Sequence, residues 1–419
     1  MCVIKIDLNT WLTLVTFMDK FSELSIKLNN TLDKTERQDN GIFFTPRAAR
    51  ERIFNFLDSF GTKTILEPSC GSGEFISDCL VRYPKAVITG VEKHEKIYSE
   101  LVKSELYTNN IKKLRLVNAD FLTASGLGKY DLVIGNPPYF VTKEKNPLCM
   151  TGRGNIFVQF IYKCLVEHVK EYGILAFVLP TSFYNCTYYS PCRDYIRNNC
   201  TILHVENIDG GYYETGQDTM IMIIRNCIDV PKFIFSRGDN NYITPFYKEL
   251  DSLLKGSKTI AELGFRVKTG EVVWNQHKDK LVSNKEMGIP VIYQTNIVDG
   301  KILLDNLKAG KNNEKKQYIS GYSGTPMTGP AILISRGFGN KYSFVYSSVE
   351  DTNFKFYGEN HINVVYCPSS AAYAADANNN TFQRIKSSLS DPRTQQFIQM
   401  FVGNGALSKT ELETILPIF

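Results

Sequence analysis

Between residues 41 and 226, short runs rich in β-branched residues alternate with stretches of helical periodicity, one of which spans residues 155–171. This alternation constrains the fold more than any other feature of the sequence. It is typical of parallel βαβ units, in which helices cover both faces of the sheet. We therefore expect an α/β fold with a twisted, mostly parallel sheet. The seven expected strands are TILEPS (64–69), AVITGVE (86–92), LRLVNAD (114–120), YDLVIGN (130–136), GILAFVLP (173–180), ILHVENI (202–208) and TMIMIIR (219–225).

The pattern differs on either side of this region. Residues 1–40 begin with apolar residues at helical spacing, from Trp11 to Leu24, and then become polar, which predicts a short helical extension. After about residue 230, strands no longer alternate with helices, and basic residues interleave with aromatic ones, as at Trp274 and Lys278. We expect an extension over 1–40, a catalytic domain over 41–239 and an α+β domain over 240–419.

Composition and charge narrow the class of protein. Hydrophobic residues make up 43% of the chain and charged residues 22%, a globular balance. The net charge is only +5, but residues 251–419 carry 19 Lys and Arg against 15 Asp and Glu. This surplus is compatible with a nucleic-acid-binding C-terminal half, and equally with a solvated surface.

The cysteines and the apolar segments indicate the cellular compartment of the protein. The ten cysteines form no CxxC pair and no Cys/His ligand spacing, so we expect free thiols and no metal site. The apolar start WLTLVTFM ends after eight residues at Asp19, too short for a membrane span. We expect an intracellular (cytoplasmic) protein that does not associate with membranes.

The sharpest motif is Asn136-Pro137-Pro138-Tyr139, which directly follows the apolar run YDLVIG. In a doubly wound sheet, ligands bind at the carboxyl ends of the strands, so this motif would stand at the rim of a ligand cleft. The prolines stiffen the turn and remove two N–H donors. The Asn136 carbonyl and the aromatic face of Tyr139 would suit a planar substrate that carries an NH₂ group.

That reading has a mechanistic consequence. The lone pair of an aromatic amine is delocalised into the ring, so the nitrogen is a poor nucleophile. Acceptors on both N–H bonds favour a more sp³-like nitrogen, whose lone pair can attack an electrophilic methyl group. Much of the acceleration would come from in-line positioning, for which up to roughly 7–11 kcal/mol is available. A proline-rich turn without any substrate is the alternative.

Three further motifs end successive expected strands. Glu67-Pro68-Ser69-Cys70-Gly71-Ser72-Gly73 is a glycine-rich strand-to-helix turn, but it is neither GxGxxG nor a Walker motif. Glu92 ends the next strand, where a carboxylate can bind ribose hydroxyls. Asp120 and Phe121 stand at the end of the third strand, where Asp120 would bind an adenine amine and Phe121 would pack on its ring. Each could be structural alone; their order points to a nucleoside cofactor.

A fourth segment, GIFFTPRAARERIFNFLDSF (41–60), precedes the first strand. Thr45 is suited to cap a helix whose first position is Pro46, and Ala49, Ile53 and Leu57 would give that helix a buried face. Capping and packing explain this segment without a ligand. Alternatively, its FTP turn would also cover one end of the cofactor.

Taken in order, FTP, EPSCGSG, VE, NADF and NPPY resemble the gamma-type DNA adenine-N6 methyltransferases over residues 41–226. The resemblance implies a Rossmann-like catalytic domain followed by a target-recognition DNA-binding domain. The implied cofactor is S-adenosylmethionine, bound by Thr45, Glu67, Cys70, Gly71, Glu92, Asp120 and Phe121. Asn136, Pro137 and Tyr139 would hold the target base.

The resemblance also implies a duplex DNA substrate whose adenine is flipped out of the helix. In such enzymes a second aromatic stacks on the base, and Tyr213 matches that position, although the family more often has Phe and Tyr212 is adjacent. Arg336 is a candidate for a base contact in the second domain. We expect a monomer, which a separately encoded restriction endonuclease would accompany.

Other readings remain open. An amine of cytosine N4, of an RNA base or of a protein glutamine fits the same motif, although the size of residues 240–419 favours a nucleic acid over a protein. A non-catalytic DNA-binding protein is a rival from another class, which cofactor binding would exclude. A fused nuclease is disfavoured, because only 40 residues precede the catalytic motifs.

Overall fold

The computed structural model describes residues 21–57, 60–208, 218–238, 240–304, 307, 315–337, 344–368, 380–401 and 407–419. The chain divides into two compact units. The first comprises Met1–Phe235 and Asn240–Tyr247, and the second comprises Ser236–Asp239 and Lys248–Phe419. The chain passes between them in the β8–β9 hairpin (Ile234–Arg237 and Asn240–Ile243) and in α10 (Tyr247–Leu253).

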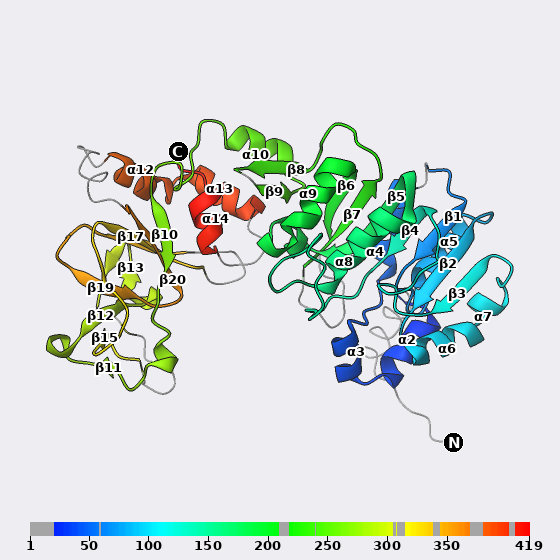
Figure 1. Cartoon of the computed structure of the whole chain (residues 1–419), viewed down its shortest axis with the longest axis horizontal. Coiled ribbons are helices and arrows are strands. Elements are labelled where there is room, and N and C mark those ends of the chain that lie inside the picture. Colours follow the sequence, from blue (N-terminus) through cyan, green and yellow to red (C-terminus); the bar gives the residue numbers. More distant parts are fainter. Residues whose placement is uncertain are drawn as a thin grey trace, which may run out of the picture. The chain divides into compact units, whose positions relative to one another are not determined.

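The first unit is built on a seven-stranded sheet with the order β3-β2-β1-β4-β5-β7-β6, in which β7 runs antiparallel to the other six strands (Figure 1). The α/β prediction with seven strands is therefore confirmed. The order reverses between β1 and β4, and ligands bind outside the carboxyl ends of strands at such a switch point. The strands are β1 (Thr64–Glu67), β2 (Val87–Glu92), β3 (Leu114–Asn118), β4 (Tyr130–Gly135), β5 (Val169–Pro180), β6 (Thr201–Ile208) and β7 (Thr219–Arg225).

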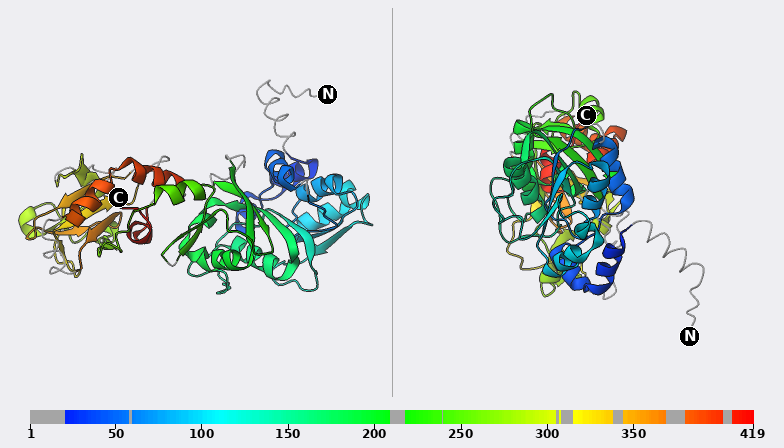
Figure 2. Two further views of the ribbon diagram at one scale, coloured as in Figure 1. Left: turned by 90° about the horizontal axis from the view of Figure 1, so that it is seen from above. Right: turned by 90° about the vertical axis from the view of Figure 1, so that its right-hand side faces the viewer.

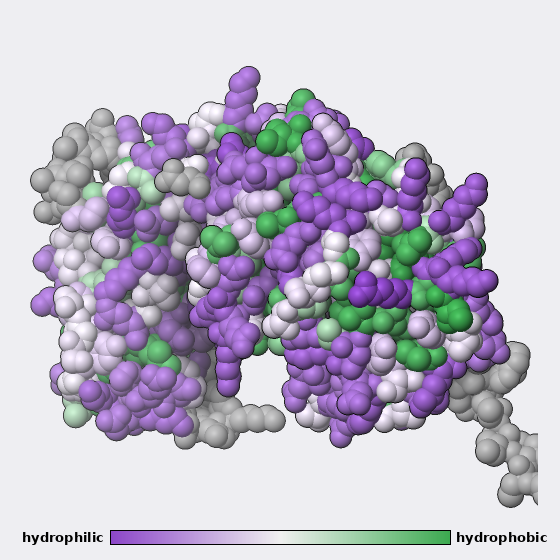
Figure 3. Space-filling view, turned by 45° about the vertical axis from the view of Figure 1, so that its right-hand side comes forward, coloured by the Kyte–Doolittle hydropathy of each residue, from purple (hydrophilic) through white to green (hydrophobic). Residues whose placement is uncertain are grey.

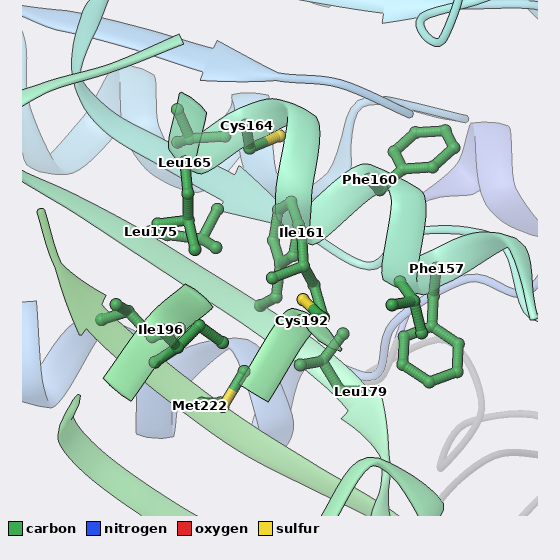
Figure 4. Close-up of a cluster of buried hydrophobic side chains, with 14 of the residues drawn as sticks. Phe157, Phe160, Ile161, Cys164, Leu165, Leu175, Leu179, Cys192, Ile196 and Met222 are labelled. Atoms are coloured by element: carbon green, nitrogen blue, oxygen red, sulfur yellow. The ribbon is translucent and has the colours of Figure 1, made fainter. Parts of the chain in front are cut away.

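Helices cover both faces of this sheet, because successive strand residues point to opposite sides. Phe177 of β5 packs in the same cluster as residues of α8 and α9, whereas the next residue, Val178, packs with α4 and α5. Figure 4 shows the first of these clusters, with Ile161 of α8 and Ile196 of α9 beside Leu175 of β5. The helices are α4 (Arg47–Leu57), α5 (Glu74–Arg82), α6 (Glu95–Lys103), α7 (Glu105–Thr108), α8 (Ile156–Lys163) and α9 (Ser190–Asn199).

Two helices precede α4: α2 (Glu23–Thr31) and α3 (Lys34–Asn40). Ser22 and Asp33 cap them by accepting from backbone N–H groups in their first turns. Leu28 of α2 packs against Ile97 of α6, and α2 lies beside α6 in Figures 1 and 2. The helical prediction for this part is confirmed from residue 23 onward; Trp11 lies outside the described residues.

The segment 164–173 departs from the expected helix over 155–171. The α-helix ends at Lys163, a π-helix spans Cys164–His168, and β5 begins at Val169, four residues before the expected strand. The pairing of β4 with β5 jumps from Tyr130↔Val169 to Leu132↔Ile174, so the extra residues form a bulge. Tyr172, with a positive φ of 61°, lies in that bulge.

The second unit contains both sheets and helices. An antiparallel sheet has the order β10-β20-β17-β18, and a five-stranded sheet has the order β11-β15-β12-β19-β16. Strands β13 (Ile297–Val298) and β14 (Lys301–Ile302) form a hairpin. The first sheet comprises β10 (Arg266–Thr269), β17 (Ala331–Ser335), β18 (Tyr346–Val349) and β20 (Ile362–Tyr366). The second comprises β11 (Leu281–Val282), β12 (Ile289–Ile292), β15 (Tyr318–Ile319), β16 (Met327–Thr328) and β19 (Lys355–Gly358). The helices are α12 (Asn380–Ser388), α13 (Pro392–Phe401) and α14 (Lys409–Thr414).

Hydrophilic residues cover much of the face shown in Figure 3, interrupted by patches of hydrophobic ones. In the part of the chain that the structure describes, no helix is long and apolar enough to cross a membrane. Over the same residues, no group of three or more His, Cys, Asp or Glu side chains is placed to hold a metal ion.

Candidate active site

A cavity of about 300 Å³ lies at the carboxyl ends of β1 to β4. Five of the residues expected at the active site line it, and they come from four separate segments: Gly71, Glu92, Asp120, Phe121 and Asn136. The structure thus brings together the ends of four strands, as the order of the motifs predicts. Pockets of this size and position hold small-molecule ligands in α/β folds.

The glycine turn between β1 and α5 shapes one side of the cavity. Gly71 and Gly73 have positive φ angles of 52° and 83°, which a side chain would strain. A Cβ on Gly73 would also lie 2.8 Å from Leu106 Cδ2. The turn is closed by the Gly73 N–H, which donates to the Cys70 carbonyl at 2.8 Å. This backbone therefore requires glycine at both positions.

Glu92, at the end of β2, is 8% exposed and faces this turn. Its two carboxylate oxygens accept from the backbone N–H groups of Gly71, at 2.8 Å, and His94, at 2.6 Å. Burial raises the pKa of Glu92, and these hydrogen bonds oppose that shift. Each oxygen retains a lone pair that can accept from a ligand hydroxyl.

The third strand end contributes Asp120 and Phe121. One Asp120 oxygen accepts from the Leu122 N–H at 2.9 Å, and the other lies 2.9 Å from Lys93 Nζ. Phe121 is buried, and its ring centroid is 5.0 Å from that of Phe160, which also lines the cavity. Phe160 belongs to the apolar face of α8, so its role was not evident from a motif.

The Asn136-Pro137-Pro138-Tyr139 turn follows β4. The Asn136 amide donates through Nδ2 to the Phe43 carbonyl at 3.3 Å, which turns its Oδ1 toward the Tyr139 hydroxyl. That hydroxyl also lies 2.7 Å from the Val178 carbonyl, and its single hydrogen can be donated to only one of these acceptors. Asn136 and Pro138 line the cavity, whereas Pro137 is buried and Tyr139 packs edge-on against Phe157.

Three other expected cofactor residues are buried next in sequence to lining residues: Thr45, Glu67 and Cys70. Burial raises the pKa of Glu67 well above its ordinary value, although Arg50 and the Ile76 N–H oppose the shift. Its Oε2 has no hydrogen-bond partner among the described residues. An orphaned buried oxygen is uncommon and fits a group that a ligand satisfies. Burial likewise raises the pKa of the Cys70 thiol.

The segment from Asn40 to Phe44 forms another wall of the cavity, although only the FTP turn at its end was expected to be near the cofactor. Gly41 ends α3 with a φ of 63°, and a Cβ there would lie 2.9 Å from both Pro138 Cβ and the Tyr139 backbone nitrogen. The first residue of the FTP-containing segment therefore touches the Asn136-Pro137-Pro138-Tyr139 turn. The one signal in the sequence for Gly41 is that glycine often follows the last residue of a helix, where a positive φ is needed.

A buried ion cluster holds the walls together. Arg50 of α4 is 5% exposed; it lies 3.0 Å from Glu74 and 2.6 Å from Asp78, both on α5, and donates to the Thr45 carbonyl. Glu74 also accepts from the Ser25 hydroxyl of α2. Arg50 and Glu74 thus join the FTP turn, the glycine turn and α2.

Two further residues were expected to contact the substrate, Tyr213 and Arg336. Tyr213 is outside the described residues. Arg336 follows β17 in the second unit, where its backbone N–H donates to the His361 carbonyl at 2.9 Å and its carbonyl accepts from the Leu407 N–H at 2.8 Å.

The charges at the cavity select among nucleoside cofactors. Three carboxylates, those of Glu92, Glu95 and Asp120, line it against one lysine, Lys93. This balance disfavours a pyrophosphate but suits a cofactor with a cationic sulfonium and ammonium. The glycine turn lacks a phosphate-binding pattern. Together with the sheet order, this defines an S-adenosylmethionine-dependent methyltransferase.

Comparisons with known proteins agree. The model of the Eco57I restriction-modification methylase family matches residues 9–213. The type II methyltransferase M.CvrRI of Paramecium bursaria Chlorella virus XZ-6E is 32% identical over 96% of this chain and 100% of its own length. The modification methylase CviBIII of Paramecium bursaria Chlorella virus NC1A is 31% identical with the same coverage. A tRNA1(Val) (adenine(37)-N6)-methyltransferase of Vibrio cholerae is 27% identical over 29% of this chain and 52% of its own. The chain belongs to the Eco57I restriction-modification methylase family.

Proposed function

We propose that this methyltransferase transfers a methyl group to the N6 amine of adenine in duplex DNA, at a short recognition sequence. Restriction-modification methyltransferases act on DNA, and a relative that matches 29% of this chain carries adenine-N6 in its name. The observation that carries the proposal is the position of Asn136, which follows β4, lines the cavity and contacts Tyr139 in the same turn.

The cavity residues fit S-adenosylmethionine. Glu92 offers acceptor lone pairs to ribose hydroxyls, Asp120 to an adenine amine, and Phe121 and Phe160 an apolar wall to the ring. The orphaned Glu67 Oε2 would accept from the ammonium end of the cofactor. When bound, the cofactor supplies an electrophilic methyl group.

The protein's part in the reaction is to position the amine. Asn136 Oδ1 and the backbone carbonyls of a turn with two prolines accept from the two N–H bonds of the amine, which keeps its lone pair available. The Asn136 amide is already oriented by its bond to the Phe43 carbonyl. No strong base is required before attack, because the amine proton becomes acidic only as the new bond forms.

The adenine must leave the helix to reach this site, at a cost of a few kcal/mol. Stacking on Tyr139, worth roughly 1–3 kcal/mol, would offset part of that cost, and Tyr213 is the proposed partner on the other face. The second unit would read the recognition sequence, with Arg336 as a candidate contact. A separately encoded restriction endonuclease would cut the same sequence when it is unmethylated.

The test is single-molecule sequencing of plasmid DNA from a methylation-free host that expresses the protein. We expect N6-methyladenine at one recurring motif, which would be absent with the Asn136→Ala variant. The variant must bind S-adenosylmethionine with the wild-type affinity, so that only the base site is altered. Methylcytosine at the motif would move the substrate to cytosine N4. Unmethylated DNA from a cofactor-binding enzyme would refute the proposal.

A further inference from the structure

The second unit carries an aromatic and basic cluster that the reaction does not use: Trp274, Tyr293, Lys278 and Lys315. Trp274 opens a 3₁₀ turn (Trp274–Gln276) and is partly buried. Lys278 Nζ lies 5.7 Å from its ring centroid, and Lys315 Nζ lies 5.1 Å from it. Lys315 Nζ also lies 5.3 Å from the ring centroid of Tyr293. Two ammonium groups therefore share one indole ring.

The two aromatic rings of this Trp274 cluster are held in place by the core of the second unit. Trp274 packs on an apolar core of the second unit that includes Val272 and Tyr293. Tyr293 is 2% exposed, and its hydroxyl donates to the Lys316 carbonyl at 3.0 Å. The lysines thus lie on a platform that belongs to the core.

More lysines lie near the cluster, from two chain segments that pair as strands. Leu281 of β11 pairs with Ile319 of β15, and the Ser320 N–H donates to the Lys280 carbonyl at 3.0 Å. Residues 274–286 and 315–320 together hold five lysines against two acidic residues. Within the described part of the chain, no ion pair involves four of these five lysines: Lys280, Lys285, Lys315 and Lys316.

Physical chemistry indicates what such a surface binds. An ammonium group over an aromatic face is attracted by the ring but sheds part of its hydration. Two of them over Trp274 repel each other, and a polyanion relieves that repulsion. Lysine binds phosphate as a point charge and carries little information about the base sequence.

We propose that the Trp274 cluster is a contact surface for the phosphate backbone of duplex DNA. This inference rests on the proposed function, since it names where the substrate of that reaction touches the second unit. It assigns the cluster to sequence-independent affinity, and it leaves base recognition to other residues.

The first test uses the full-length double variant Lys278→Ala/Lys315→Ala and short duplexes of several sequences. Each phosphate contact lowers the slope of log K against log salt by about 0.9. Loss of two contacts should make the slope less negative by about 1.8 and lower the affinity equally for all sequences, with cofactor affinity unchanged. The matched control is Lys255→Ala/Lys409→Ala, two exposed lysines of the same unit outside the cluster. A slope equal to that of the control would overturn the proposal, as would a loss confined to one sequence.

A second test uses fluorescence, because the chain has only two tryptophans, Trp11 and Trp274. In a Trp11→Phe variant, Trp274 is the only indole. Duplex DNA is expected to change its emission at the concentrations that saturate binding, and unchanged emission would refute contact at this surface. If single-stranded RNA bound through the lysines and duplex DNA did not, the proposal would also fail. Methylation of DNA by a lysine variant with the wild-type salt slope would overturn this surface alone and leave the reaction standing.

Discussion

Glu92 is the residue on which cofactor affinity should depend most. Its carboxylate accepts from Gly71 and His94, so it holds the glycine turn and presents lone pairs to the cavity at once. We expect Glu92→Ala to raise the dissociation constant of S-adenosylmethionine by at least tenfold, because a hydrogen bond to a charged group contributes about 1.5–3 kcal/mol of binding free energy.

Isothermal titration calorimetry on the purified variant would measure this loss. A melting curve close to that of the wild type would show that the turn itself has survived. An unchanged dissociation constant would remove Glu92 from the cofactor site.

Tyr139 combines a ring for stacking with a hydroxyl that reaches the Val178 carbonyl at 2.7 Å. We expect Tyr139→Ala to lose methyl transfer while keeping cofactor affinity, because stacking contributes roughly 1–3 kcal/mol. Tyr139→Phe keeps the ring and should retain most of the activity. Single-turnover rates of both variants separate the two contributions; equal losses would place the function in the hydroxyl.

Among the elements, α8 and the π-helix that follows it support the cofactor wall from behind. Lys163, at the end of α8, donates to the Leu122 and Ala124 carbonyls at 2.9 Å each, and its Nζ lies 5.4 Å from the Phe121 ring centroid. His168 of the π-helix accompanies it, with its ring centroid 5.3 Å from that of Phe121. Lys163 is therefore a positioning residue for Phe121.

We expect Lys163→Met to raise the KM for S-adenosylmethionine several-fold and to leave kcat nearly unchanged, because it loosens the loop that carries Phe121. Lys163→Arg retains the positive charge and should restore part of the affinity. Steady-state kinetics at saturating DNA measure both constants. A fall in kcat at constant KM would contradict this role.

The elements also show which features a sequence reveals. The seven strands were predictable because each is a short apolar run, and the strand ends carried the motifs. The early start of β5 was not predictable, because residues 169–173 (VKEYG) continue the helical pattern of the sequence, whereas in the structure they begin the strand and contain its bulge. In the second unit, strands of two residues, such as β11 and β15, are too short to show a period.

The site shows a comparable division. The positions of Glu92 and Asn136 at one cavity were predictable, because Glu92 ends a strand, Asn136 follows one, and strand ends meet at one edge of a parallel sheet. Arg50 and Glu74 lie on amphipathic helices, where a charge is normally assigned to the solvent side; their burial depends on a pairing between α4 and α5 that no periodicity records. Gly41 is similar, since its neighbours Pro138 and Tyr139 are distant in sequence.

At the scale of the whole molecule, the two units have separate cores. One unit buries the faces of the seven-stranded sheet, and the other buries residues such as Val291 and Phe356. Among the described residues, those that line the cavity at the ends of β1 to β4 all belong to the first unit. A ligand stabilises what binds it, by about 2.7 kcal/mol at one hundred times its dissociation constant. S-adenosylmethionine should therefore stabilise the first unit and not the second.

Urea unfolding of the Trp11→Phe variant can test this, because Trp274 then reports on the second unit alone. With the cofactor at one hundred times its dissociation constant, the midpoint from Trp274 emission should not move. The midpoint from far-ultraviolet circular dichroism, to which the helices of the first unit contribute, should rise. With Glu92→Ala added and the cofactor concentration unchanged, the midpoint from circular dichroism should rise by less, because a tenfold higher dissociation constant leaves only about 1.4 kcal/mol of stabilisation. If both midpoints rose together, the two cores would unfold as one cooperative system, and cofactor binding would then stabilise the second unit around Trp274 as well.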